Sequence, residues 1–303
     1  MRNHLTRRLA SSTLACVLGL GVLLPTTGQA GAVLDRIKAS GEITLAHRES
    51  SVPFSFMNRD KKPVGYALDL CHKLVEAVAR QLALPTLATR YLQVTPANRI
   101  AMIEEGKADL ECGSTTNNAE RREKVAFTVP HYITGARFLV RADTKAQRLN
   151  DFRGFKMVST KGTTPLAAIT RANSDQLLGM QILEAPDHAR AVDMVESGEA
   201  DAFAMDDVLL YGLAAGRAVP GKLKVVGKFL TIEPLAIMLP KNDPEFKKLI
   251  DNEMRRLILS KEAQSIYERW FIRAIPPNDR ALNLPMNYLL KDFWKYPSDQ
   301  VPG

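Results

Sequence analysis

Short apolar segments alternate with segments of helical periodicity from Gly41 onward. The apolar segments predict strands at residues 43–46, 88–94 and 109–113. Between them, one predicted helix presents an apolar face, and a second spans residues 99–105 and ends at Gly106. The apolar face consists of Leu70, Leu74, Val75, Val78 and Leu82. Strands that alternate with amphipathic helices predict an α/β lobe with a mainly parallel sheet.

A second set of the same elements begins near Phe152. It predicts strands at 156–160, 181–183 and 202–205, with helices ending near 172 and spanning 189–196. Two stretches also echo each other, because Met102–Asp109 reads MIEEGKAD and Met194–Asp201 reads MVESGEAD. The echo favours two lobes of related design. Helix-stop chemistry alone is the competing explanation, since glycine commonly follows a helix.

Two β-rich segments, residues 136–141 and 235–239, lie where the chain would cross between the lobes. The first lobe is therefore predicted to be discontinuous, with the two crossover strands forming a hinge. Leu289, Leu290, Phe293 and Trp294 lie close together near the end of the chain and predict a short packed helix. The predicted organisation is a signal peptide at 1–30, a first lobe at 31–138 and 236–280, a second lobe at 139–235 and a C-terminal tail at 281–303.

The first thirty residues have the pattern of a secretory signal peptide. Three arginines precede an uncharged, mostly apolar run from Leu9 to Leu24, and small residues follow up to Ala30. The run is shorter than the roughly 20 apolar residues that span a bilayer, which disfavours the alternative of a membrane anchor. Cys16 lies inside the run, where a lipoprotein cysteine is not expected. We therefore expect a periplasmic protein whose signal peptide is cleaved.

The charge balance is basic, with a formal net charge of +8 over the 303 residues. Removal of the predicted signal peptide, which carries three arginines and no acid, leaves +5. No stripe of Lys and Arg with interleaved aromatic residues occurs, so nucleic acid is not the expected partner. Anionic small ligands fit the balance better, and no cofactor or metal-binding spacing is present. Cys71 and Cys112 could form a disulfide in an oxidising compartment or be two small buried residues.

Candidate ligand-binding residues lie at the ends of the predicted elements. Ser114 and Thr116 follow a strand, Arg121 lies in the next helix start, and Thr160 and Thr163 lie at a similar junction in the second lobe. Hydroxyls, free backbone N–H groups and a guanidinium at such junctions can bind an anion. The alternatives are a solvated arginine and a simple N-cap threonine.

Four further candidates complete the set. Asp206 ends a strand at the edge where open α/β sheets place ligands, although an aspartate there can equally be an N-cap. Arg48 follows a strand, Arg99 begins a helix and His188 precedes another helix. Each is unremarkable alone, and a lone histidine is more often structural. Together they predict a second anion pocket.

Several of these stretches resemble the periplasmic amino-acid-binding proteins of ABC transporters, in particular the glutamate/aspartate-binding branch of the polar amino acid group. They are HRESSVPFSF from His47, GYALDL from Gly65, ECGSTTNNAERR from Glu111, KGTT from Lys161, DH at Asp187 and MDD from Met205. The resemblance covers residues 41 to 277. It implies a type II periplasmic binding protein fold, with the ligand in the cleft between the lobes.

The resemblance also implies roles for the candidates. Arg121 would bind the α-carboxylate with help from Thr116, Thr160 and Thr163, while Ser114 and Asp206 would bind the α-ammonium. The side-chain carboxylate would be surrounded by Arg48, Arg99 and His188. Pro96 departs from the pattern, because the family has a small hydroxyl residue three positions before the arginine that corresponds to Arg99. This departure leaves the choice between glutamate and aspartate open.

We therefore expect a non-enzymatic, monomeric binding protein that captures glutamate or aspartate by lobe closure and delivers it to an ABC permease. One alternative is another polar amino acid such as glutamine. A second is a cyclohexadienyl or arogenate-type dehydratase on the same fold, with Glu49 or His188 as the acid or base. A third is a sensory partner in place of the transporter.

Overall fold

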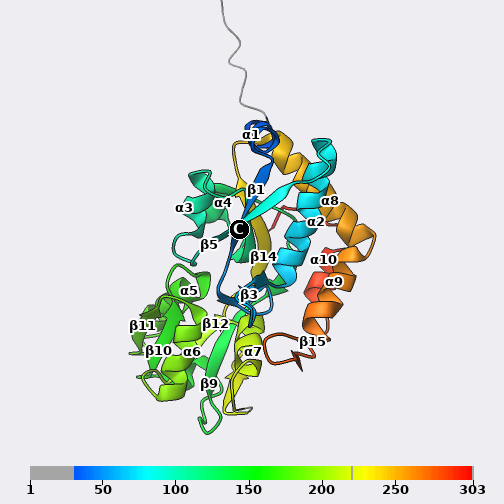
Figure 1. Cartoon of the computed structure of the whole chain (residues 1–303). Coiled ribbons are helices and arrows are strands. Elements are labelled where there is room, and N and C mark those ends of the chain that lie inside the picture. The colour runs from blue at the N-terminus through cyan, green and yellow to red at the C-terminus, as the bar shows by residue number, and fades with distance from the viewer. Residues whose placement is uncertain (1–30, 220, 302–303) are drawn as a thin grey trace, which may run out of the picture.

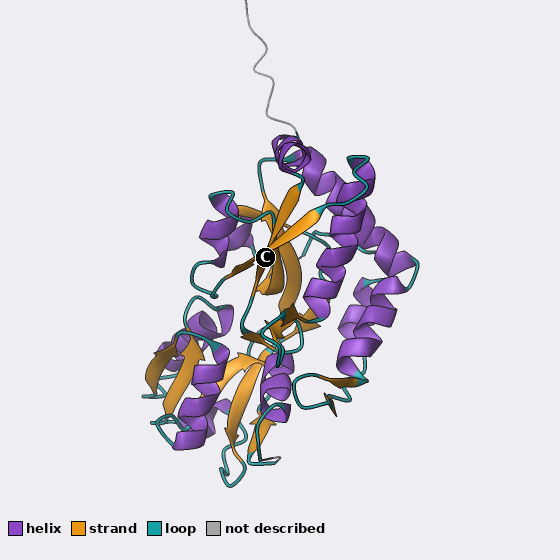
Figure 2. Cartoon of the chain, viewed as in Figure 1, coloured by secondary structure: helices purple, strands orange, loops and turns teal. Residues whose placement is uncertain are grey.

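The computed structural model describes residues 31–219 and 221–301. The predicted signal peptide, 1–30, lies outside the described residues. The chain forms two α/β lobes, one above the other in Figure 1, which confirms the predicted two-lobed α/β class. Each lobe contains one large sheet with helices packed against it (Figure 2).

The first sheet has the strand order β5-β1-β6-β14-β7, and β8 also pairs with β14. Strands β5, β1 and β6 are parallel, whereas β14 is antiparallel to its neighbours. The strands are β1 (Glu42–His47), β5 (Ala88–Gln93), β6 (Leu110–Thr116), β7 (Val125–Phe127), β8 (Tyr132–Thr134) and β14 (Glu233–Pro240). A small separate sheet contains β2 (Ser50–Ser51), β3 (Ser55–Met57) and β4 (Pro63–Val64).

The second sheet repeats the design with the order β11-β10-β12-β9-β13. Its strands are β9 (Ala136–Arg141), β10 (Lys156–Thr160), β11 (Gln181–Ala185), β12 (Ala202–Asp206) and β13 (Leu223–Val226). The last strand was not predicted from the sequence. Since β10, β11 and β12 are parallel and β9 runs antiparallel, both lobes have three parallel strands followed by one antiparallel strand.

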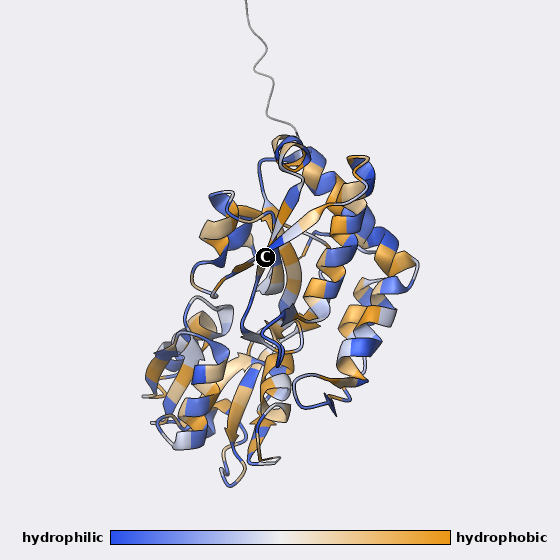
Figure 3. Ribbon diagram, in the orientation of Figure 1, coloured by the Kyte–Doolittle hydropathy of each residue, from blue (hydrophilic) through white to orange (hydrophobic). Residues whose placement is uncertain are grey.

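Helices cover both faces of each sheet, and the strands of both sheets contain many hydrophobic residues (Figure 3). In β1, Ile43 and Leu45 join the large core beneath α2, α8 and α9, while Ala46 joins the smaller core beneath α3. In the first lobe the helices are α1 (Ala32–Ser40), α2 (Tyr66–Gln81), α3 (Arg99–Glu104), α4 (Ala119–Arg122), α8 (Pro244–Leu259), α9 (Glu262–Phe271) and α10 (Tyr288–Phe293). In the second lobe they are α5 (Thr164–Asp175), α6 (His188–Ser197) and α7 (Asp207–Ala215).

The chain crosses between the lobes at Gly135 and again at residues 229–232. Strand β8 pairs in the first sheet and β9 in the second, so only Gly135 separates them. The first crossing therefore lies three or four residues before the predicted boundary at 138/139. On the return, β14 begins at Glu233, three residues before the predicted boundary at residue 236. The predictions followed the apolar runs, but sheet membership depends on pairing with distant strands.

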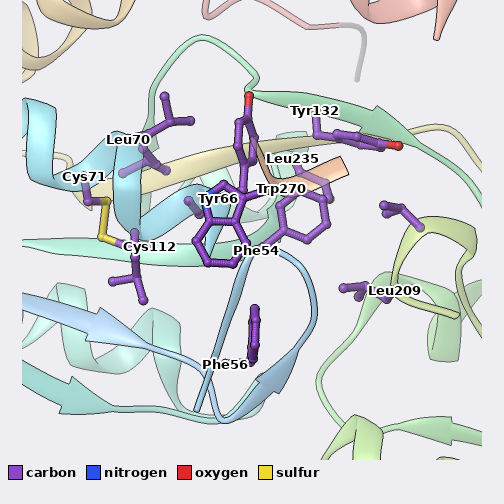
Figure 4. Close-up of a cluster of buried hydrophobic side chains, with 14 of the residues drawn as sticks. Phe54, Phe56, Tyr66, Leu70, Cys71, Cys112, Tyr132, Leu209, Leu235 and Trp270 are labelled. Atoms are coloured by element: carbon purple, nitrogen blue, oxygen red, sulfur yellow. A yellow bond between two sulfur atoms is a disulfide. The ribbon is translucent and has the colours of Figure 1, made fainter. Parts of the chain in front are cut away.

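The first-lobe core is rich in aromatic rings and contains a disulfide (Figure 4). Phe54 contacts Tyr66, Tyr132 and Phe271 with ring centroids 5.3–6.0 Å apart. Beside this cluster, Cys71 of α2 is bonded to Cys112 of β6. The bond ties a helix to the central part of the sheet and decides between the two alternatives that the sequence left open.

The C-terminal segment, residues 274–301, packs against both lobes. In β16 (Arg280–Ala281), which pairs with β15 (Ala274–Ile275), Arg280 donates to the carbonyls of Ala215 and Arg217 at the end of α7. Trp294, just after α10, donates to the carbonyl of Pro130 in the first lobe. The predicted packed helix is confirmed, since Leu290 is fully buried.

Candidate functional site

The carboxyl ends of the parallel strands in both sheets face the same cleft. Ser114 and Thr116 end β6, Thr160 ends β10 and Asp206 ends β12. Arg48 follows β1 in the same way. Open α/β sheets bind ligands at this edge, because the strand ends and the helix starts leave polar groups without regular partners there.

A small cavity lies between the lobes. It is lined by seven of the nine predicted residues: Arg48, Arg99, Ser114, Thr116, Thr163, His188 and Asp206. The two others lie directly behind the lining. Thr160 bonds to His188 and Arg121 bonds to the carbonyl of Thr116. The structure therefore brings all nine candidates together, with contributions from both lobes.

At one end of the cavity, Arg48 of the first lobe meets His188 of the second. Arg48 Nη2 lies 3.4 Å from His188 Nε2, and His188 Nδ1 lies 2.8 Å from Thr160 Oγ1. Burial, followed by Arg48 and Arg99, holds the pKa of His188 well below its usual value, so the ring is neutral. A guanidinium can only donate, so Nε2 accepts and Nδ1 carries the proton that Thr160 receives.

Positively charged groups that are shielded from water line one end of the cavity. Burial and the neighbouring Arg99 lower the pKa of Arg48 to about 9. Arg48 Nη1 and Arg99 Nε are buried and have no hydrogen-bond partner among the described residues. Burial and Arg99 likewise lower the pKa of Arg121 to about 10. Buried cations without partners are costly, so this end of the site is suited to an anion that accepts several hydrogen bonds.

Asp206 of the second lobe faces this positive cluster. Its Oδ1 atom is buried and has no partner among the described residues. Burial, with the nearby Glu233 and Asp207, raises the pKa of Asp206 well above its usual value, while Arg99 and Arg121 oppose the rise. An ammonium group placed against Asp206 would favour its ionised form and satisfy the free oxygen.

Buried carboxylates that the sequence analysis missed also surround the guanidinium groups. Glu111 is fully buried and accepts from Thr115 Oγ1 at 2.6 Å. Glu233 is 2% exposed and accepts from Thr164 Oγ1 at 2.7 Å. Neither lines the cavity. Strand alternation places Glu111 on the face opposite Leu110 and Cys112 and gives no sign that it is buried. The position of Glu233 depends on the return crossing.

Two glycines allow the lobes to pack closely. A Cβ on Gly162 would lie 2.8 Å from Pro96 O and from Ala97 Cα, both in the first lobe. A Cβ on Gly212 would lie 2.4 Å from the carbonyl oxygen of Val52. Arg121 Nη2 also reaches the carbonyl of Gly162 at 3.4 Å. The structure is therefore the closed arrangement of the lobes, and Pro96 contacts the other lobe through its backbone.

Some local predictions need correction. Strand β6 continues to Thr116 because β14 pairs with it, so Ser114 and Thr116 belong to a strand and not to the strand-to-helix junction. Asp206 makes no side-chain cap bond to α7, whereas Thr163 does cap α5. Glu49, considered as a catalytic acid or base, is exposed and lines a different, apolar pocket.

Among residues 31–219 and 221–301, no group of three or more His, Cys, Asp or Glu side chains could hold a metal ion. No helix in these ranges combines the length and apolar character needed to cross a membrane.

The chain is similar to known solute-binding proteins over most of its length. Residues 43–273 match the family model described as bacterial extracellular solute-binding proteins, family 3. The glutamate/aspartate import solute-binding protein of Salmonella typhimurium is 38% identical over 297 residues, covering 97% of this chain and 98% of the relative. The L-glutamate/L-aspartate-binding protein of Pseudomonas aeruginosa is 41% identical over 269 residues, covering 88% and 89%.

The fold is also similar to that of solved amino-acid-binding proteins. A crystal structure of an ancestral amino acid-binding protein, a precursor of cyclohexadienyl dehydratase, superposes with a TM-score of 0.66 at 25% identity. The superposition covers 78% of this chain and 98% of that chain.

Proposed function

The chain belongs to the bacterial extracellular solute-binding proteins, family 3, and from this premise we propose that it captures glutamate or aspartate and delivers it to an ABC permease. The protein would be exported, act as a monomer and bind its ligand by closing the two lobes. The observation that carries the proposal is the cluster of three buried guanidinium groups around one cavity that both lobes line. The ligands printed in the names of the two relatives support the same class of ligand.

The charges of the site match the charges of an acidic amino acid. Arg48 and Arg99 would donate to the side-chain carboxylate, with His188 beside it accepting from Arg48. Arg121 with the junction at Thr160 and Thr163 would receive the α-carboxylate. Ser114 and Asp206 would take the α-ammonium. Micromolar binding requires a net free energy of only about 8 kcal/mol, which a few charge-assisted hydrogen bonds in a closed site supply after ordering costs.

The competing functions have less support. The two relatives described above cover most of the chain and are named as binding proteins, which favours binding over dehydratase chemistry. His188 is held neutral by burial and is already hydrogen-bonded to Thr160. A neutral ligand such as glutamine would leave one guanidinium without an anionic partner, and this disfavours it.

Calorimetry tests the proposal. The mature protein should bind glutamate or aspartate tightly, and glutamine and histidine weakly or not at all. Arg48→Met should lower the affinity by roughly 30-fold or more, since loss of one partner of a buried charge pair costs about 2–5 kcal/mol. Arg171→Met is the matched control, because the Arg171 side chain is 84% exposed. Tight binding of glutamine without binding of glutamate would overturn the assignment.

A further inference from the structure

Three side chains form a hydrogen-bonded chain that passes between the lobes beside the cavity. Thr116, at the end of β6 in the first lobe, lies 3.1 Å from Thr164 through their Oγ1 atoms. Thr164 begins α5 in the second lobe and donates to Glu233 Oε2 at 2.7 Å. Glu233 begins β14, immediately after the return crossing, and so belongs to the first lobe. The chain of bonds therefore requires the closed arrangement.

Counting hydrogens fixes the direction of each bond. A carboxylate accepts but cannot donate, so Thr164 gives its single hydroxyl proton to Glu233. Thr164 then has no proton left for Thr116, and the 3.1 Å contact must use the proton of Thr116. Thr116 lines the cavity, and there its Oγ1 atom presents only acceptor lone pairs. An oxygen of this kind can bind an ammonium group but repels a carboxylate.

We propose that Glu233 is a positioning residue that, acting through Thr164, holds the Thr116 hydroxyl as an acceptor for the α-ammonium group of the ligand. The inference rests on the proposed function and refines it, because Thr116 was expected to help bind the α-carboxylate. Asp206 supplies the second acceptor through its free Oδ1 atom. The site thereby selects amino acids over dicarboxylates that lack the ammonium group.

The surroundings of Glu233 fit this role. The carboxylate is buried, does not line the cavity and lies within electrostatic range of Arg99, Arg121 and Asp206. Thr164 is the first residue of a 12-residue helix, where partial positive charge favours a nearby carboxylate. A structural role at this helix start is the competing explanation, and it predicts equal effects on all ligands.

The test compares L-glutamate with glutarate, which has the same two carboxylates and no ammonium group. Glu233→Gln and Thr164→Val should each weaken L-glutamate binding about tenfold, the worth of roughly one hydrogen bond to a charged group. Glutarate binding should be unchanged or stronger, because Thr116 can then donate. Thr164→Ser is the matched control, since it keeps the hydroxyl and should keep the preference.

Calorimetric affinities decide the outcome. Equal weakening of both ligands by Glu233→Gln, or an unchanged preference, would overturn the positioning role. If glutarate binds too weakly to measure in every variant, loss of L-glutamate affinity in Thr164→Ser as large as in Thr164→Val would overturn it, and retention in Thr164→Ser would support it. Failure of the unmodified protein to bind L-glutamate would instead refute the proposed function.

Discussion

Replacement of Gly162 by alanine should separate closure of the lobes from their stability. Gly162 has φ +78° in the turn between β10 and α5, so any other residue there adopts a left-handed conformation. This costs about 1 kcal/mol in the ligand-free and the ligand-bound protein alike. The added Cβ also lies 2.8–2.9 Å from backbone atoms of Pro96 and Ala97, but only when the lobes are closed.

The contact with the other lobe sets the size of the effect on binding. Its neighbours are backbone atoms, which cannot rotate away as the end of a side chain can. Overpacking of this kind costs about 1–3 kcal/mol, which corresponds to a roughly 5- to 150-fold loss of affinity. The matched control is Gly198→Ala, because Gly198 has φ +81° in the same lobe and its Cβ would meet nothing within 4 Å.

Calorimetry with L-glutamate and thermal unfolding without ligand provide the two measurements. Both variants should lower the ligand-free melting temperature by a similar amount, and only Gly162→Ala should weaken binding. Equal affinities for the two variants would refute the close packing of Gly162 against Pro96 and Ala97 in the bound state.

Three further predictions concern stability and local order. Replacing Cys71 and Cys112 with alanine should cost about 4 kcal/mol of unfolding free energy in denaturant titrations, given the sequence separation of 41 residues. An unchanged midpoint would contradict the bond. His131 is buried beside Phe54 with both ring nitrogens unpartnered among the described residues, and burial lowers its pKa to about 3. The folded state therefore binds fewer protons than the unfolded state below pH ~6.5, and His131 alone contributes a loss of stability of about 1.4 kcal/mol per pH unit as the pH falls towards 3. His131→Phe should reduce the slope in melting curves at pH 4–6.5 by this amount, and an unaltered slope would exclude a contribution from His131. Arg280→Ala should speed amide hydrogen exchange at the end of α7, because two carbonyl partners are lost, and unchanged exchange there would argue against that contact.

Local patterns predicted most of the elements because each pattern depends on neighbours in the sequence. The apolar face from Leu70 to Leu82 and the strand at 156–160 both correspond to observed elements. Predictions failed where a distant segment decides the structure. Strand β6 extends to Thr116 only because β14, more than a hundred residues later, pairs with it.

The candidate site likewise has parts that local patterns predict and parts that depend on contacts between distant segments. Residues at element ends could be listed from the sequence, since strand and helix boundaries leave polar groups near an edge. The contact of Glu233 with Thr164 could not be predicted, because it joins the two lobes. The bond between Cys71 and Cys112 also depends on the packing of α2 on β6, which no spacing in the sequence reveals.

The position of β14 has a consequence for how the molecule is assembled. This strand is inserted between β6 and β7, so the first sheet keeps a gap in its interior until residue 240 is available. The second sheet needs nothing beyond residue 226. The lobe that starts later in the chain is thus the first whose sheet can be completed. A chain that stops before β14 lacks an inner strand of its first sheet but retains every strand of its second.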